Sequence, residues 1–218
     1  ANEVRTRWPE IIATEDISTA GRVQAWTVGP GIGTDQTARR ILAAAVEAGV
    51  PLCLDADAIN LLAEHAELRA AIRGRPVVLT PHDREFARVA GSIGADRVEA
   101  TRRAAANLGV TVLLKGHATV IADPDGRTQV VCSPSSWPAT AGSGDVLAGI
   151  IGALLASGLP PWWAAGCAAY LHGQAALLAA DDAPIPASHL QAAIPEAIRS
   201  VRAAARNRAV RSGDEVVR

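Results

Sequence analysis

Short runs of apolar, often β-branched residues alternate along this chain with longer segments of helical pattern. Runs of strand length lie at residues 25–28, 50–54, 76–80 and 110–114, and the first three are each followed by such a segment. The clearest helical segment begins at Thr34 and Asp35, whose side chains can cap it. Helices of this length between strands indicate parallel pairing, because two neighbouring parallel strands need a long crossover connection, which is usually a helix. The pattern therefore predicts an α/β fold, with a central, largely parallel sheet and helices on both faces.

The remaining elements complete one domain. Residues 118–122 and 129–132 predict a hairpin, because the turn-forming sequence Asp123-Pro124-Asp125-Gly126 lies between them. A length of 218 residues suits one domain with a sizeable core, which we place at residues 1–205. Residues 206–218 are polar and without periodicity, and they predict a mobile tail. Further helices are predicted at residues 58–64, 84–90, 96–108, 146–157, 161–179 and 187–205.

Composition argues against several classes of partner. A net charge of −1 gives no electrostatic reason to expect nucleic acid or an acidic membrane, and an aromatic content of 3% argues against base stacking. The 3 cysteines form no CxxC pattern, which indicates buried thiols in a reducing compartment and predicts a cytoplasmic protein. The uncharged segment at residues 146–171 has the length of a membrane span, but Gly158, Pro160 and Pro161 interrupt it. We expect two packed helices there and no membrane association.

The loop Thr140-Ala141-Gly142-Ser143-Gly144-Asp145 runs directly into an uncharged helical segment. Unpaired N–H groups at a helix start attract phosphate oxygens, and glycines let the backbone approach an anion closely. We therefore interpret Gly142, Ser143 and Gly144 as an anion-binding turn. Two roles are open to Asp145: a base that takes a proton from a hydroxyl about to attack phosphorus, or simply the N-cap of the helix.

Other polar residues follow the first two predicted strands, at the edge of the sheet where open α/β proteins bind ligands. The sequence Gly29-Pro30-Gly31-Ile32-Gly33-Thr34 resembles a dinucleotide fingerprint without matching it, so a simple strand-to-helix turn is the alternative. Asp55 and Asp57 follow the second strand and can hold Mg²⁺ through water. For Asp57 we favour a structural role as the cap of the next helix, whereas both roles stay open for Asp55.

Two further positions follow the third and fourth predicted strands. His82 can hydrogen-bond a polar substrate, while Glu85 fits an acid of the first helical turn. Lys115 is the only lysine of the chain and precedes Gly116, a position that suits a nucleotide phosphate or its neighbouring hydroxyls. The alternative for Lys115 is an edge-strand residue in solvent.

Taken as a set, these motifs closely resemble the ADP-dependent NAD(P)H-hydrate dehydratases, which are repair enzymes of ribokinase-like fold. The resemblance runs in order from about Trp8 to Arg199, and Tyr170-Leu171-His172-Gly173 adds to it. It implies that hydrated NADH or NADPH is dehydrated while ADP becomes AMP and phosphate. Phosphorylation turns the ring hydroxyl into a good leaving group, and elimination restores the double bond. The motifs lie at residues 28–33, 54–57, 79–82, 114–116 and 140–145.

The resemblance also implies roles for single residues. Asp145 is the catalytic base, and the amides of residues 142–145 stabilise the transferring phosphoryl group. Mg²⁺ bridges the phosphates, with protein ligands that we leave unassigned. The hydrated nicotinamide nucleotide contacts Gly31, Gly33 and His82 together with Asp145. The residues implied to border the adenine nucleotide are Lys115, Gly116, His117, Ala118 and Thr119, with Gly144.

This chain departs from related sequences at two places, which affect the predicted activity and the predicted completeness of the enzyme. Many ribokinase-like kinases have Asn-x-x-Glu where this chain has His82-Asp83-Arg84-Glu85, which fits the dehydratase better than a vitamin kinase. Family members begin with a further segment, whereas this chain starts just before Trp8. We expect that segment to be supplied by another polypeptide, to have been removed, or to be lacking in an incomplete enzyme. Some relatives carry a fused epimerase, which nothing in this chain resembles.

The alternatives to the dehydratase are an ATP-dependent kinase of small alcohols, of the thiamine-precursor type, and a nucleotide-binding fragment without turnover. The kinase would use Asp145 in the same way and stop after phosphorylation. The uncharged helices after Asp145 can serve a subunit interface as well as a core, and we expect a homo-oligomer.

Overall fold

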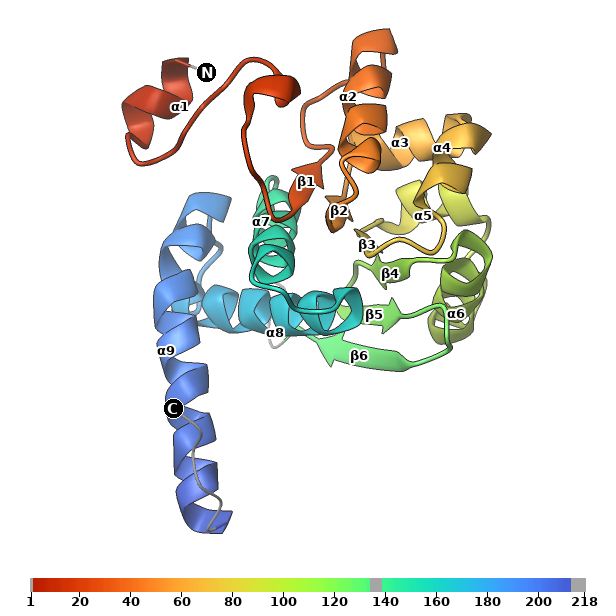
Figure 1. The fold of residues 1–218 in the computed structure, drawn as a ribbon. Coiled ribbons are helices and arrows are strands. Elements are labelled where there is room, and N and C mark those ends of the chain that lie inside the picture. Colours follow the sequence, from red (N-terminus) through yellow and green to blue (C-terminus); the bar gives the residue numbers. More distant parts are fainter. Residues whose placement is uncertain (1, 134–138, 213–218) are drawn as a thin grey trace.

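A sheet of six strands in the order β1-β2-β3-β4-β5-β6 forms the centre of the computed structural model, which describes residues 2–133 and 139–212 (Figure 1). β1 to β4 are parallel, and β5 and β6 close the sheet as an antiparallel hairpin. The prediction of a largely parallel α/β sheet is confirmed. The strands are β1 Trp26–Val28, β2 Leu52–Leu54, β3 Val77–Leu79, β4 Thr111–Leu114, β5 Ala118–Ala122 and β6 Thr128–Cys132.

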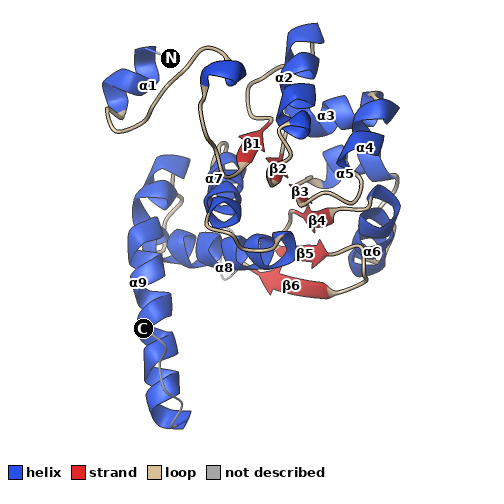
Figure 2. Ribbon diagram, viewed as in Figure 1, coloured by secondary structure: helices blue, strands red, loops and turns tan. Residues whose placement is uncertain are grey.

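Helices cover both faces of the sheet (Figure 2). On one face, α2 packs against β1, and α6 packs against β4 and β5; on the other face, α7 contacts β1 and β2, and α8 contacts β3 to β6. The helices are α1 Asn2–Arg7, the 3-10 helix η1 Ile17–Thr19, α2 Gln36–Glu47, α3 Asp57–Glu64, α4 Ala66–Ile72, α5 Asp83–Ala90, α6 Arg97–Leu108, α7 Ser143–Ala156, α8 Pro161–Ala180 and α9 Ala187–Ser212.

Alternating side chains of the strands fill two separate apolar clusters. Leu52 and Leu54 of β2 belong to the cluster under α2 to α6, whereas Cys53 belongs to the cluster under α7 and α8. Successive side chains of a strand point to opposite faces, so a strand covered on both faces needs an apolar residue at every position. This explains why β2, β3 and β4 are apolar runs and are buried throughout, apart from the polar Thr111, which is buried too.

The helices after the anion-binding turn are separate, as predicted. α7 ends at Ala156, and α8 begins at Pro161, where a proline fits because the first helical N–H needs no partner. Among residues 2–133 and 139–212, no helix combines the length and the apolar character that a membrane span requires.

The structure differs from the predicted elements at four places. The sequence pattern did not predict α1, η1 or α4, all of which are short. The last helix was expected to end at residue 205, but α9 continues to Ser212, because the three arginines and the alanine of residues 206–212 favour a helix even where the sequence has no apolar periodicity. The rest of the predicted tail, residues 213–218, lies outside the described residues.

Candidate active site

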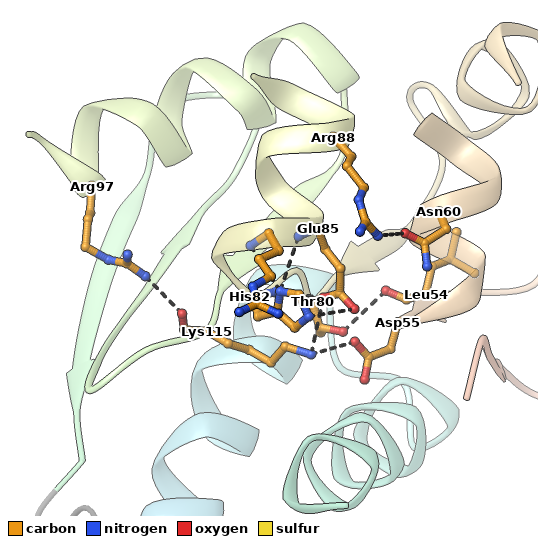
Figure 3. A network of polar contacts seen from close by, with 10 residues as sticks. Leu54, Asp55, Asn60, Thr80, His82, Glu85, Arg88, Arg97 and Lys115 are labelled. Atoms are coloured by element: carbon orange, nitrogen blue, oxygen red, sulfur yellow. Dashed lines mark hydrogen bonds and ion pairs between the residues drawn. The ribbon is translucent and has the colours of Figure 1, made fainter. Parts of the chain in front are cut away.

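Polar side chains from the ends of β2, β3 and β4 converge at one edge of the sheet (Figure 3). Lys115 follows β4, and its Nζ donates to Asp55 Oδ1, after β2, at 2.7 Å. The same Nζ lies 3.7 Å from Glu85 Oε2, in the first turn of α5. The Lys115 side chain is 20% exposed, and those of Asp55 and Glu85 are 2% and 8% exposed. Lys115 is therefore not an edge-strand lysine in solvent, and Asp55 is its buried partner.

His82 is the N-cap of α5 and forms a reciprocal pair with Glu85. Its Nδ1 accepts from the backbone N–H groups of Arg84 and Glu85 at 3.1 and 3.2 Å. In return, Glu85 Oε2 accepts from the N–H of His82 at 2.8 Å. This is a capping box with histidine in place of serine. Glu85 therefore does more than complement the helix dipole, because it fixes the backbone of His82 and faces Lys115.

Arg97, the first residue of α6, ties two of these loops together. One guanidinium nitrogen, Nη2, donates to the carbonyl of Lys115 at 2.9 Å, and Nη1 donates to Asp83 Oδ1 at 2.9 Å. A Cβ at Gly116 would lie 2.8 Å from Arg97 Nη2, so the guanidinium packs directly on the backbone of that loop. Arg97 was not predicted as a site residue, because no local pattern distinguishes it from the other arginines.

The anion-binding turn begins at Gly142, which is the N-cap of α7 and has a φ of +85°. That left-handed conformation favours glycine, since a Cβ would be strained there. Ser143, Gly144 and Asp145 form the first helical turn. The N–H of Ser143 donates to the carbonyl of Thr140 at 3.2 Å, so the N–H groups of Gly144 and Asp145 are the ones that this helix start can offer to a ligand. A Cβ at Gly144 would lie 3.5 Å from Lys115 Nζ, so the ammonium stands directly beside this turn. Both features favour an anion at this place.

Asp145 is exposed, and it is not the N-cap of α7, which excludes one of the two roles considered for it. Its carboxylate borders two hollows. One is a cavity of about 610 Å³ at the strand ends, and the other is an apolar groove of about 490 Å³ between α7, α8 and α9. A carboxylate at the anion-binding turn and open to a cavity has the placement that a general base needs.

The larger cavity brings most of the predicted site residues together. Gly31, Gly33 and Ala118 are not among its described lining residues. The backbone N–H of Gly33 instead donates to Asp57 Oδ2 at 2.9 Å. The predicted residues that line the cavity are His82, Lys115, Gly116, His117, Thr119, Gly142, Ser143, Gly144 and Asp145.

Asp57 has a structural role, although not the predicted one. The N-cap of α3 is Ala56, with a φ of 47° and no capping side chain, and Asp57 is already the first helical residue. The unusual turn at Ala56 lets the Asp57 carboxylate reach back to the loop after β1, where it holds Gly33. The prediction that Asp57 caps α3 is therefore wrong.

His172 of α8 lines the cavity, and only the family resemblance pointed to it, through the motif Tyr170-Leu171-His172-Gly173. Its Nε2 lies 2.9 Å from the carbonyl oxygen of Ser143, at the start of α7. Burial lowers the pKa of the His172 imidazole below its usual value, because a charged ring loses hydration there. No sequence pattern predicts this contact, because the two residues are far apart in the sequence.

The cavity has an excess of negative charge. Among its described lining residues are three carboxylates, Asp55, Glu85 and Asp145, and one ammonium, Lys115. A phosphate-bearing ligand in this cavity therefore calls for an accompanying cation. Within the described part of the chain, no group of three or more His, Cys, Asp and Glu side chains could hold a metal ion on its own. A hard cation would be held by few carboxylates and by ligand oxygens and water, which is how Mg²⁺ is commonly bound.

A parallel sheet with a glycine-containing anion turn at the carboxyl ends of its strands is consistent with the ribokinase-like class. A solved ribokinase-like superfamily protein from Enterococcus faecalis superposes with a TM-score of 0.69 at 30% identity, covering 81% of this chain and 63% of that one. A family model described as NAD(P)H-hydrate dehydratase matches residues 1–198, and the chain belongs to this family.

Named relatives agree with the family. A bifunctional NAD(P)H-hydrate repair enzyme of Mycobacterium leprae is 52% identical over 181 residues, which is 83% of this chain and 38% of the relative. An ADP-dependent (S)-NAD(P)H-hydrate dehydratase of Neisseria meningitidis is 44% identical over 204 residues, 89% of this chain and 69% of the relative. An ADP/ATP-dependent NAD(P)H-hydrate dehydratase of Bacillus subtilis, co-crystallised with ATP and Mg²⁺, superposes with a TM-score of 0.69 at 30% identity, over 81% of this chain and 66% of that one. The chain thus spans well under half of the M. leprae relative.

Proposed function

We propose that this protein dehydrates hydrated NADH or NADPH to the reduced cofactor while it converts ADP to AMP and phosphate. The observation that carries the proposal is the shared cavity of Lys115, the anion-binding turn and Asp145. These groups supply a cation, backbone donors and a base, which phosphoryl transfer to a hydroxyl requires. The names of the N. meningitidis and B. subtilis relatives support the choice of substrate.

The proposed chemistry has two stages. The ring hydroxyl attacks the terminal phosphorus of ADP, Asp145 takes the hydroxyl proton, and the phosphorus–oxygen bond to AMP breaks. The phosphorylated oxygen then leaves as phosphate with its bonding electrons, and loss of a ring proton restores the double bond. The amides of residues 142–145 and the Lys115 ammonium stabilise the charge that develops on the phosphoryl oxygens.

The two substrates approach Asp145 from different loops. We assign the adenine nucleotide to the loop after β4, with Lys115, Gly116, His117, Ala118 and Thr119, and to Gly144. We assign the hydrated nicotinamide nucleotide to Gly31, Gly33 and His82. Under this assignment the acceptor belongs to the loops after β1 and β3 and the phosphoryl donor to the loop after β4, and Asp145 contacts the acceptor hydroxyl.

Mg²⁺ fits the excess negative charge of the cavity. When bound, it neutralises phosphate charge. We assign Asp55 to hold it through water, because Asp55 is buried at the cavity wall and its Oδ2 faces Gly144, 3.9 Å from the position of a Cβ there. A homo-oligomeric state and a cytoplasmic location stay predictions.

The test follows the nicotinamide absorbance of hydrated NADH with ADP and Mg²⁺, with ATP in a parallel sample. We expect absorbance to recover with ADP, together with the release of AMP and phosphate. A sample with ATP and a thiamine-precursor alcohol in place of the hydrate tests the alternative, and accumulation of the stable phosphorylated alcohol there would identify a small-alcohol kinase. Binding of ADP without any release of phosphate, even at high protein concentration, would identify a nucleotide-binding chain without turnover.

Replacing the base provides the sharper prediction. Asp145→Asn keeps the shape of the side chain and removes its basicity, so we expect nucleotide binding to persist while kcat falls by about 10²- to 10⁴-fold. The control is Asp125→Asn in the exposed hairpin turn, where asparagine also suits the turn and turnover should not change. Unchanged turnover in Asp145→Asn would remove Asp145 from the mechanism.

A further inference from the structure

The anion-binding turn has a weak start for a helix. Its N-cap, Gly142, offers no side-chain hydrogen bond to the free N–H groups of the first turn. Gly144 lies in the same turn, and glycine is the least favourable helix residue apart from proline. The local sequence therefore holds the first turn of α7 by backbone hydrogen bonds without a capping side chain, although phosphoryl transfer needs donors and base held to within about 0.5 Å.

A contact from another helix compensates for this weakness. α8 packs against α7, below it in the view of Figure 1. The His172 side chain of α8 lines the cavity, and its Nε2 lies 2.9 Å from the carbonyl oxygen of Ser143, the first residue of α7. This contact joins residues 29 positions apart in the sequence.

The chemistry of the contact defines the histidine tautomer. A backbone carbonyl only accepts hydrogen bonds, so Nε2 must carry the proton. In the neutral ring Nδ1 then has none. Burial favours the neutral ring, because it lowers the pKa of His172. The Nε2–H group is thus committed to Ser143, which favours a role in holding the turn over a role in moving protons.

We propose that His172 is the positioning residue of the anion-binding turn: its Nε2–H group anchors the Ser143 carbonyl and thereby orients the amides of residues 142–145 and the Asp145 carboxylate. The catalytic part of this inference rests on the proposed function. The structural part, the anchoring of the first turn of α7, does not.

The experiment compares variants that separate the hydrogen bond from the volume of the side chain. His172→Gln retains an N–H donor of similar reach, whereas His172→Leu fills the space without a donor. The control is His189→Leu, an exposed histidine near the start of α9 that contributes nothing to either hollow. The readouts are kcat and KM for ADP, the ratio of ADP to AMP affinity, and amide hydrogen exchange of residues 143–147.

We expect His172→Leu to lower kcat by about 10- to 100-fold, because a misplaced first turn misaligns donors and base. It should also reduce the ratio of ADP to AMP affinity, since only ADP carries the second phosphate, and speed hydrogen exchange in the first turn of α7. His172→Gln should stay within about threefold of the wild type, as should His189→Leu. An equal loss of kcat in His172→Gln and His172→Leu would overturn the proposal. So would a His172→Leu variant whose hydrogen exchange and ADP-to-AMP affinity ratio equal those of the wild type.

Failure of the proposed function is distinguishable from failure of this inference. If the wild type shows no ADP-dependent dehydration, the proposed function fails, while the affinity ratio and the exchange of residues 143–147 still decide on the anchor. If His172→Leu does not fold, His172→Asn replaces it, because its shorter amide cannot reach Ser143. Wild-type exchange in a folded His172→Asn would then refute the anchor.

Discussion

The ammonium group of Lys115 forms ion pairs with two buried carboxylates. Its ammonium contacts Asp55 at 2.7 Å and Glu85 at 3.7 Å, and it stands beside Gly144. Buried carboxylates are costly unless they are paired, so this lysine has a structural task apart from any ligand. A phosphate that enters the cavity meets an ammonium that is already held in place.

Removing this charge should therefore affect both binding and stability. We expect Lys115→Ala to weaken ADP binding by at least about tenfold and to lower the free energy of unfolding by about 3 kcal/mol, because Asp55 and Glu85 lose their cation. Titration calorimetry and denaturant unfolding measure the two effects.

Arg39→Ala is the matched control for loss of a paired cation. Arg39 and its partner Glu67 are about half exposed, and exposed pairs contribute about 1 kcal/mol or less. ADP affinity should not change in this variant. An equal ADP affinity of Lys115→Ala and wild type would refute the assignment of Lys115 to the nucleotide.

At the scale of elements, the loops after β1 and β2 are joined by a very close backbone approach. Gly29 follows β1 with a φ of +141°, and a Cβ there would lie 1.7 Å from the carbonyl oxygen of Asp55. The N–H of Asp55 in turn donates to the carbonyl of Val28 at 3.1 Å. The position of Asp55, and with it that of Lys115, thus depends on the absence of a side chain at Gly29.

Gly29→Ala should consequently separate the two loops. We expect a loss of more than about 2 kcal/mol in the free energy of unfolding, because the methyl group overlaps backbone that cannot move without breaking strand contacts. Gly21→Ala is the control, since Gly21 also has a positive φ, +71°, but nothing lies within 4 Å of its Cβ position. It should lose only about 1 kcal/mol. Denaturant unfolding measures both variants. If Gly29→Ala and Gly21→Ala lose the same free energy of unfolding, backbone strain alone, and not the loop contact, matters at Gly29.

At the scale of the whole molecule, the cavity joins elements that are far apart in the sequence. Its walls come from the ends of β2, β3 and β4 and from α7 and α8. α7 and α8 lie on one face of the sheet, whereas α5, whose first turn contributes Glu85, packs with α3 in the cluster on the other face. A ligand that bridges these walls stabilises the folded chain as a unit.

ADP with Mg²⁺ should therefore raise the melting temperature. At an ADP concentration of 100 times Kd the stabilisation is about 2.7 kcal/mol, which corresponds to roughly 5–10 °C for a chain of this size. ADP without Mg²⁺ should give a smaller shift, because the cavity has more carboxylates than ammonium groups. Differential scanning calorimetry measures both. A shift of the same size with and without Mg²⁺ would contradict the need for a cation.

Much of this organisation could be predicted from local patterns. The strands, the hairpin and the helices on both faces of the sheet follow from apolar periodicity, because period 2 and period 3.6 are properties of neighbouring residues. The glycine-containing helix start at Gly142 to Asp145 and the strand-end positions of His82 and Lys115 follow from motifs of the same short range, whereas anion binding there stays a prediction. The role of Asp57 could not be predicted in this way, because the unusual backbone of Ala56 directs it to Gly33 instead of to its own helix.

The sequence by itself determined the α/β class, the order of the elements and the edge of the sheet at which the polar loops gather. Only the tertiary structure decided which side chains meet there: Lys115 with Asp55 and Glu85, Arg97 with the carbonyl of Lys115, and His172 with Ser143. The physical reason is the separation along the sequence over which each kind of interaction acts. Backbone propensity and apolar periodicity act over a few residues, whereas an ion pair or an anchoring hydrogen bond depends on how separate helices and strands pack.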